Sequence, residues 1–187
     1  MIQGDVTLAE NSRCPIAIMA QPPINMSDLT LEDFLLQIIH STEGSASKGI
    51  KLDFKSTRVV EPAFRNLARH IDYLKGPLVL HADIIAGDNK QGAQPVDIWT
   101  FLMLIRTRFP KAIISMGWCV DVNKNTLETG YSMNMVDQML QIVKEYSLLQ
   151  PITFPVNAAL VKYSIAELQR LLFQVGRYAS KRFFVLE

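Results

Sequence analysis

The segment Gly49–Lys55 carries the strongest chemical signal in the sequence. Side chains alternate across a β-strand, so Lys51, Asp53 and Lys55 are expected on one face and the apolar residues between them on the other. Two ammonium groups beside a carboxylate should hold that carboxylate in its charged form. The pattern is either a polar site or a solvated strand end with ordinary ion pairs, and the apolar opposite face favours the site.

Two further apolar runs present polar residues in the same way. His81 and Asp83 share one face of a later run, and Gln3 and Asp5 share one face of the first. If the runs form a parallel sheet, Asp5, Asp53 and Asp83 all lie at carboxyl ends of strands, where α/β barrels place their chemistry. Oxygen ligands from separate strands suit Mg²⁺ or Ca²⁺, so these three carboxylates are the predicted metal ligands.

Three other residues have a structural alternative beside the functional one. A lone histidine is more often structural than catalytic, but the carboxylate two residues after His81 favours a functional role. Trp118 ends an apolar run and either walls a pocket or belongs to the core, which is the commoner case. Pro155 lacks the backbone donor of a central strand and predicts a bend at a sheet rim.

Apolar runs rich in β-branched residues supply the elements that must position these side chains. Several of them are nearly continuous in apolar residues, which is typical of strands covered on both faces. Helical stripes lie between most of them, as at Leu31, Phe34, Leu35 and Ile38, which follow a candidate cap at Thr30. The seven expected strands are Met1–Leu8, Pro15–Ala20, Gly49–Phe54, Pro77–Asp83, Ala112–Trp118, Ile152–Asn157 and Arg182–Leu186.

Strands that alternate with helices predict a parallel α/β sheet in a single domain. Only Ala9–Cys14 separates the first two runs, so no helix fits there. Seven strands suit a doubly wound open sheet, whereas a (β/α)8 barrel needs eight. Because the first run begins at Met1, we expect the barrel alternative to lack its first strand, with residues 1–187 forming one N-terminally incomplete domain.

The composition excludes several classes of protein. The chain has 187 residues, with 19 Lys and Arg against 18 Asp and Glu, and this balance argues against a nucleic-acid partner or a polybasic membrane surface. No apolar run approaches the roughly 20 residues of a membrane span, and no signal peptide is present as written. Nucleotide-binding and serine-hydrolase motifs are missing. Cys14 and Cys119 are expected at opposite strand ends, as free thiols.

Motifs along nearly the whole chain resemble those of the menorin family. The resemblance implies an eight-stranded barrel of the phospholipase C-like phosphodiesterase kind, with metal and acid–base groups at its carboxyl-terminal rim. It also implies a location outside the cell and cell-surface or extracellular proteins as partners, with the cytoplasm as the alternative because no signal peptide is seen. The motifs are Ile18–Pro23, Asp28–Phe34, Gly49–Lys55, His81–Asp83, Ser115–Trp118 and Thr153–Val156.

The chain departs from the family pattern at four positions. Gln3 stands where the related phosphodiesterases have a metal-binding glutamate, and Gln21 where menorins have a histidine. His81 replaces an asparagine, and Asn157 replaces an arginine. An amide does not transfer protons near neutral pH, so Gln21 cannot act as a general acid or base.

Two functions of different class follow from these departures. The first is a binding module with degenerate catalytic residues, whose pocket comprises Gln3, Gln21, Trp118 and Asn157. The second is a metal-dependent phosphodiesterase with altered residues, in which Lys51, Asp53 and His81 are catalytic. Either one is compatible with a phosphodiester ligand, and the departures favour binding.

Overall fold

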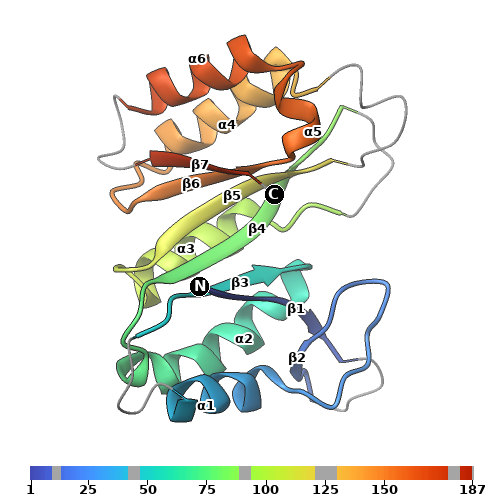
Figure 1. Cartoon of the computed structure of the whole chain (residues 1–187), viewed down its shortest axis with the longest axis vertical. Helices are drawn as coiled ribbons and strands as arrows, with labels where there is room; N and C mark the ends of the chain where they lie inside the picture. Colours follow the sequence, from blue (N-terminus) through green and yellow to red (C-terminus); the bar gives the residue numbers. More distant parts are fainter. Residues whose placement is uncertain (10–13, 42–46, 89–93, 121–129, 177–181, 187) are drawn as a thin grey trace. The chain divides into compact units, whose positions relative to one another are not determined.

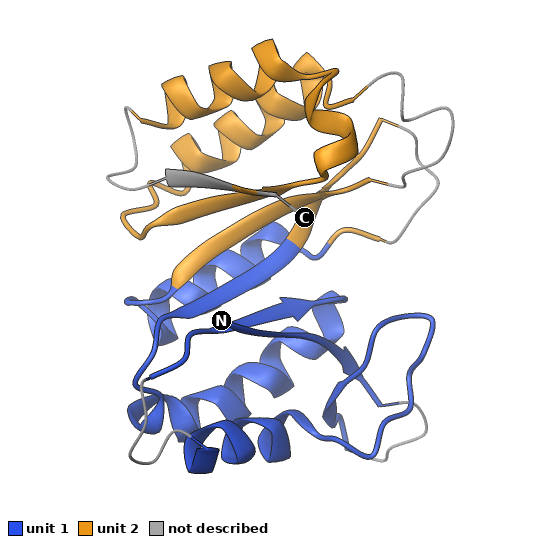
Figure 2. Cartoon of the chain, in the orientation of Figure 1, with its two compact units in different colours: residues 1–82, 96–112 blue, residues 83–95, 113–187 orange. Residues whose placement is uncertain are grey.

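The computed structural model describes residues 1–9, 14–41, 47–88, 94–120, 130–176 and 182–186. Strands and helices alternate along these residues (Figure 1). The chain divides into two compact units, which are described separately (Figure 2). Unit 1 consists of residues 1–82 and 96–112, and unit 2 of residues 83–95 and 113–187.

Unit 1 is a mostly parallel sheet with helices packed against it. Its strands follow the order β2-β1-β3-β4, in which β1 runs parallel to β3 and β3 runs parallel to β4. Helix α2 packs against both α1 and α3. The elements are β1 (Ile2–Leu8), β2 (Ala17–Met19), α1 (Leu31–Ser41), β3 (Ile50–Phe54), α2 (Thr57–His70), the short 3-10 helix η1 (Ile71–Tyr73), the first part of β4 (Leu78–Ala86) and α3 (Ile98–Arg108).

Strand β2 runs antiparallel to β1, with Val6 opposite Met19 and Leu8 opposite Ala17. The sequence sets the first two runs apart from the others, and the structure adds the direction of the second. A parallel return needs a crossover of a dozen or more residues, and the link between β1 and β2 is too short for one. The expectation that no helix lies between them concerns a segment of which residues 10–13 lie outside the described residues.

Four phenylalanine side chains form the centre of the unit 1 core. The ring of Phe54 on β3 lies 5.2 Å from Phe64 on α2 and 6.0 Å from Phe101 on α3, and Phe64 lies 5.1 Å from Phe109. Phe54, Phe64 and Phe101 are fully buried. Burial of these rings fixes which face of β3 meets the helices, and so turns the alternate residues to the other face.

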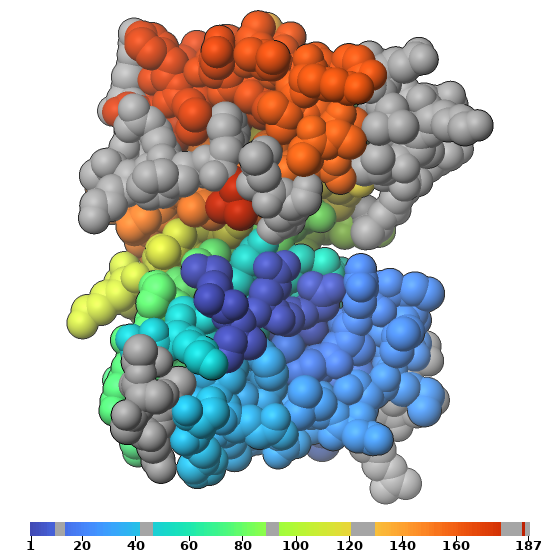
Figure 3. All heavy atoms as spheres, viewed as in Figure 1, coloured from blue at the N-terminus to red at the C-terminus, as the bar shows by residue number. Residues whose placement is uncertain are grey.

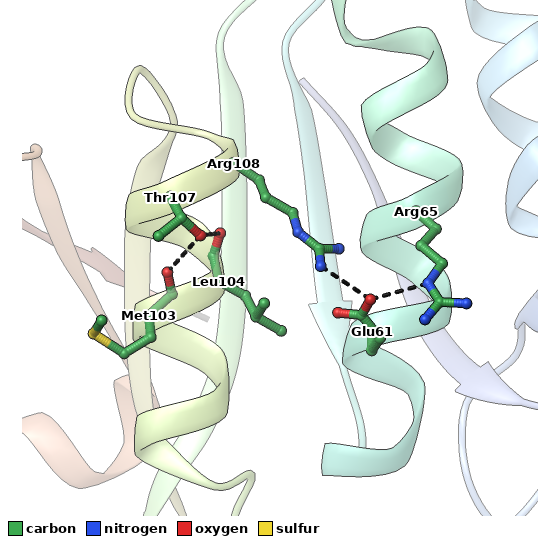
Figure 4. A network of polar contacts seen from close by, with 6 residues as sticks. All are labelled: Glu61, Arg65, Met103, Leu104, Thr107 and Arg108. Atoms are coloured by element: carbon green, nitrogen blue, oxygen red, sulfur yellow. Dashed lines mark hydrogen bonds and ion pairs between the residues drawn. The ribbon is translucent and has the colours of Figure 1, made fainter.

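Ion pairs join α2 to the end of α3 (Figure 4). Glu61 accepts hydrogen bonds of 2.9 Å from Arg65, one turn further along α2, and of 2.9 Å from Arg108, the last residue of α3. Burial pushes the pKa of Glu61 upward, but the hydrogen bonds and charges of Arg108 and Arg65 outweigh it and lower that pKa. Glu61 and Arg108 are 47 residues apart in the sequence, so this contact links two helices that are distant along the chain.

Helix starts are set by side-chain caps. Thr30 accepts a hydrogen bond from the Asp33 amide at the start of α1, as expected from the sequence. Asp97 accepts from the amide of Thr100 at the start of α3, and this bond lowers the pKa of Asp97. In unit 2, Ser132 plays the same part for Met135. These caps satisfy amides that have no partner within the helix.

Unit 2 repeats the alternation of strands and helices. Its strands follow the order β4-β5-β6-β7, and β6 runs parallel to both β5 and β7. Helices α4 and α6 pack against each other on the same side of β6 (Figure 1). The elements are the last residues of β4, β5 (Ile113–Cys119), α4 (Met133–Glu145), β6 (Ile152–Val156), α5 (Ala158–Val161), α6 (Ile165–Val175) and β7 (Arg182–Leu186).

The predicted α/β class is confirmed, and each of the seven apolar runs contains a strand. Cys14 and Cys119 are free thiols, also as predicted. Among the helices that the structure describes, none is long and apolar enough to cross a membrane. Closure into a barrel and a single domain over residues 1–187 stay predictions.

Candidate functional site: a carboxylate pair around a lysine

Asp5, Asp53 and His81 form a row across three neighbouring strands of unit 1. Asp5 on β1 is the register partner of Asp53 on β3, and Asp53 is the register partner of His81 on β4. All three strands run in the same direction, so the three side chains lie near the same end of the sheet. The prediction that Asp5 and Asp53 come together is confirmed.

Lys55 lies between the two carboxylates. Its Nζ is 2.6 Å from Asp53 Oδ2 and 3.5 Å from Asp5 Oδ1. The backbone positions this side chain, because the Lys55 amide donates a 3.1 Å hydrogen bond to the carbonyl of Val6 and so extends the β1–β3 ladder by one residue. The sequence places Lys55 on the face of Asp53 and predicts that it favours the charged carboxylate, but it does not predict the contact with Asp5.

The histidine and the second lysine of the predicted catalytic set are buried beside this pair. His81 Nε2 lies 3.8 Å from Asp53 Oδ2, and His81 is 3% exposed. Lys51 is 4% exposed and is the register partner of Gln3 on β1. Four of the predicted residues, Asp5, Asp53, His81 and Lys51, therefore lie on neighbouring strands of one unit.

Burial dominates the protonation of both carboxylates. It raises the pKa of Asp53 above the ordinary value of 3.8, and the opposing effects of Lys55 and Lys51 do not cancel it. Burial also raises the pKa of Asp5, where the charge of Lys55 again offsets only part of the rise and the charge of Asp53 adds to it. The flanking lysines thus act in the expected direction, favouring the charged form of Asp53, but desolvation has the larger effect on its pKa.

A cavity of about 410 Å³ opens beside Asp5. Its polar lining comes from Asp5, Gln3 and Gln21, and its apolar lining from β2 and the start of α1. A side chain at Gly4 would collide with the end of Met19 and lie 3.7 Å from the ring of Phe34, so glycine keeps this space open. The lining residues are Gln3, Gly4, Asp5, Met19, Ala20, Gln21, Leu29 and Phe34.

Of the four predicted pocket residues, Gln3 and Gln21 line this cavity, and their role in binding stays a prediction. Gln3 and Gln21 are exposed, and the first residues of the chain, dark blue in Figure 3, reach the visible surface of unit 1. The apolar lining residues Met19, Leu29 and Phe34 were missed. The sequence holds no local signal for them, because they approach Gln3 only through the fold.

The residues around Lys55 do not fit a divalent cation. Across the parts of the chain with described coordinates, no group of three or more His, Cys, Asp or Glu side chains is arranged to hold a metal. A metal ion would need carboxylate oxygens at about 2.0–2.6 Å. Asp53 Oδ2 already accepts a hydrogen bond of 2.6 Å from the Lys55 ammonium group.

The remaining predicted residues belong to unit 2. Asp83 is half-buried on the later part of β4. Trp118 is 4% exposed, donates from Nε1 to the carbonyl of Met135 at 3.1 Å, and packs 5.1 Å from the ring of Tyr131. These are the contacts of a core residue, the alternative already weighed for this tryptophan; its role in a pocket stays a prediction.

Asn157 has two structural bonds. Its side chain accepts from the amide of Ala159 at 2.9 Å and caps α5, while its backbone amide donates to the hydroxyl of Tyr131 at 2.8 Å. Tyr131, a residue that the sequence does not single out, is in turn held by Ser164, which accepts a hydrogen bond from the Tyr131 amide. Asn157 is thus part of a local hydrogen-bonded framework in unit 2.

Residues 1–180 match the family model described as the Menorin N-terminal domain. The chain belongs to the menorin family. Over 180 residues it is 40% identical to human Protein FAM151B, an alignment that covers 96% of this chain and 62% of that protein. The chain therefore spans less than two thirds of this curated relative. No solved structure matches it.

Membership of the menorin family fits the motif order seen in the sequence. The matched residues include the whole carboxylate–lysine cluster and every residue that lines the cavity. They also include Asp83, Trp118 and Asn157, the predicted residues of unit 2. Gln3, Gln21, His81 and Asn157 also lie within the matched residues.

Proposed function

We propose that this chain is a non-hydrolytic binding domain of the menorin family, whose ligand occupies the cavity beside Asp5. The polar lining of that cavity carries the proposal: it consists of the amides of Gln3 and Gln21 and the carboxyl group of Asp5. Amides donate and accept hydrogen bonds without exchanging protons near neutral pH. The lining suits recognition of a ligand, and the carboxyl group in it, that of Asp5, is paired with the Lys55 ammonium group.

The mixed character of the cavity supports the same proposal. Met19, Leu29 and Phe34 give it an apolar wall opposite the polar side chains. Small-molecule sites commonly combine an apolar surface with a few polar groups that fix orientation. Loss of general acid–base groups lowers rates by about 10²–10⁴-fold for each role, so a domain with glutamine at these places would be a poor hydrolase.

The proposal places this site in one barrel-type domain that acts outside the cell and engages cell-surface or extracellular proteins. The parallel pairing of β1, β3 and β4 in unit 1, and of β5, β6 and β7 in unit 2, supports a (β/α)8-type architecture. The family resemblance supports the location and the class of partner. Measuring whether the tagged chain reaches the medium of expressing cells tests the location.

Two measurements test the binding role. Bis-p-nitrophenyl phosphate with Mg²⁺ or Ca²⁺ should not be hydrolysed above the buffer rate by folded protein. Glycerophosphocholine serves as the probe of a phosphodiester ligand. It should raise the melting temperature of the wild type and of the control variant Lys75→Gln, because Lys75 is an exposed residue between η1 and β4. It should not do so for Gly4→Val, because the valine side chain collides with Met19 and so displaces part of the cavity wall. A wild type that does not respond contradicts a phosphodiester ligand.

A second candidate, a metal-dependent phosphodiesterase, is favoured by one observation. His81 Nε2 lies 3.8 Å from Asp53 Oδ2, so an imidazole has a carboxylate beside it that could orient it for proton transfer. In this alternative Lys51, Asp53 and His81 are catalytic. Hydrolysis in the same assay that is lost in His81→Gln and Asp53→Asn, but kept in Lys75→Gln, would establish it in place of the binding role.

A further inference from the structure

The carboxylate pair of Asp5 and Asp53 already has a cation. The Lys55 ammonium group reaches both side chains, at 3.5 Å and 2.6 Å, from a backbone that the β1–β3 ladder fixes. Lys55 follows Asp53 by two residues, just after the end of β3, so its side chain projects from the same face of the sheet. One positive charge therefore bridges two negative charges on adjacent strands.

The bridge lies in partly desolvated surroundings. The exposed fractions of the side chains are 24% for Lys55, 20% for Asp5 and 10% for Asp53. An ion pair on an open surface contributes little, but charges removed from water need a partner nearby. The two carboxylates thus depend on a nearby cation, whichever cation it is.

A divalent metal and the lysine compete for the same place. A metal ion would bind carboxylate oxygens at about 2.0–2.6 Å, close to where the Lys55 ammonium lies. Two cations about 4 Å apart repel each other, and the repulsion is stronger when one is divalent and little water screens the charges. A metal could therefore bind only by displacing Lys55 from the pair.

We infer that Lys55 is the resident cation of this site, and that its ammonium group occupies the position between Asp5 and Asp53 that a divalent metal would take. The site is then independent of metal, and removal of the ammonium group opens a metal site. The inference goes beyond the binding role and does not rest on it, because a binding domain and an enzyme could both hold a lysine here.

Calorimetric titration of the full chain with Mn²⁺ tests the inference. Wild type, Lys55→Arg and the exposed control Lys75→Met should show no saturable binding up to about 5 mM, whereas Lys55→Met should bind with a dissociation constant at least 10-fold lower than about 5 mM. Adding Asp53→Asn to Lys55→Met should abolish that binding. Lys55→Gln replaces Lys55→Met if the methionine variant fails to fold by circular dichroism.

Two results would overturn the inference. One is saturable Mn²⁺ binding by the wild type that Asp53→Asn removes, because the metal and the lysine would then coexist. The other is a folded Lys55→Met or Lys55→Gln variant that binds no Mn²⁺, because the lysine would then not occupy a metal position. Neither result depends on whether glycerophosphocholine binds or a phosphodiester is hydrolysed, so the proposed function is judged separately.

Discussion

Asp5 and Asp53 face each other across two parallel strands and share a single ammonium group. Both carboxylates are partly removed from water, and this burial raises the pKa of each above its ordinary value. The consequences for stability can be measured without knowing the ligand.

Removal of the shared cation should destabilise the protein. Lys55→Met leaves two partly buried carboxylates without their bridge, and we expect the free energy of unfolding to fall by about 1–3 kcal/mol. Asp53→Asn in the same background should restore about 1–2 kcal/mol, because it removes one of the two charges. Urea unfolding of the four proteins in this double-mutant cycle measures the coupling, and strictly additive effects would contradict the shared bridge.

Acid titration should reveal the raised carboxylates. The folded-state pKa of Asp53 lies above 3.8, so the folded protein binds this proton more tightly than the unfolded chain. Its contribution to stability is fully present below 3.8 and is lost as the pH rises through the folded pKa. In the wild type, this residue should make the free energy of unfolding fall as the pH rises above 3.8. Asp53→Asn should make that fall smaller, as measured by denaturant unfolding at stepwise pH.

Glu61 supplies a control of opposite sign. Its folded-state pKa is lowered from 4.5, so its contribution is present above 4.5 and is lost as the pH falls through the folded pKa. Because the Glu61 side chain is about a third exposed, the effect should stay below about 1 kcal/mol. Glu61→Gln should reduce the rise in the free energy of unfolding that the wild type shows as the pH increases. If Glu61→Gln and Asp53→Asn instead change the pH dependence in the same direction, the opposite pKa shifts of the two residues are contradicted.

Two glycines should respond differently to the same substitution. Alanine at Gly76 would press its Cβ into the backbone of Lys48 and lie 2.9 Å from the amide nitrogen of Gly49, so we expect a loss of about 1–3 kcal/mol. Alanine at Gly4 meets only the flexible end of Met19, and the loss should stay below about 1 kcal/mol. Thermal unfolding compares them, and equal losses would contradict the packing described.

Two buried hydroxyl groups should also differ. Thr153 Oγ1 has no hydrogen-bond partner among the described residues, so Thr153→Val should raise the free energy of unfolding by about 1 kcal/mol. Ser164 Oγ both accepts from the Tyr131 amide and donates to the Leu160 carbonyl. Ser164→Ala should lower it by about 1–3 kcal/mol. Destabilisation by valine at 153 would show that the hydroxyl has a partner after all.

Much of the fold could be predicted because local patterns dictate it. The stripe that includes Leu31 and Leu35 becomes the buried face of α1, and the continuous apolar run around Leu52 becomes a buried strand. The direction of β2 was within reach, since a link as short as Ala9–Cys14 favours an antiparallel return. Barrel closure depends on pairings between distant segments, which periodicity does not encode.

The site could be predicted only to the extent that it follows from the alternation of side chains along each strand. Alternation along β3 places Lys51, Asp53 and Lys55 together, and parallel register adds Asp5. The direction of the Asp53 pKa shift depends on how deeply neighbouring elements bury it, which no local pattern gives. The cavity draws on β1, β2 and α1, and its lining therefore becomes visible only in three dimensions.

The two bonds of Asn157 bear on how this menorin domain could change over time. The family pattern has arginine at this position, but here the side chain holds the first turn of α5 through Ala159. Asn157→Arg would add a positive charge and at the same time uncap that turn, at a loss of about 0.5–2 kcal/mol. The residue that the resemblance places at 157 is therefore incompatible with the present start of α5, and both cannot be had without a further change in that turn.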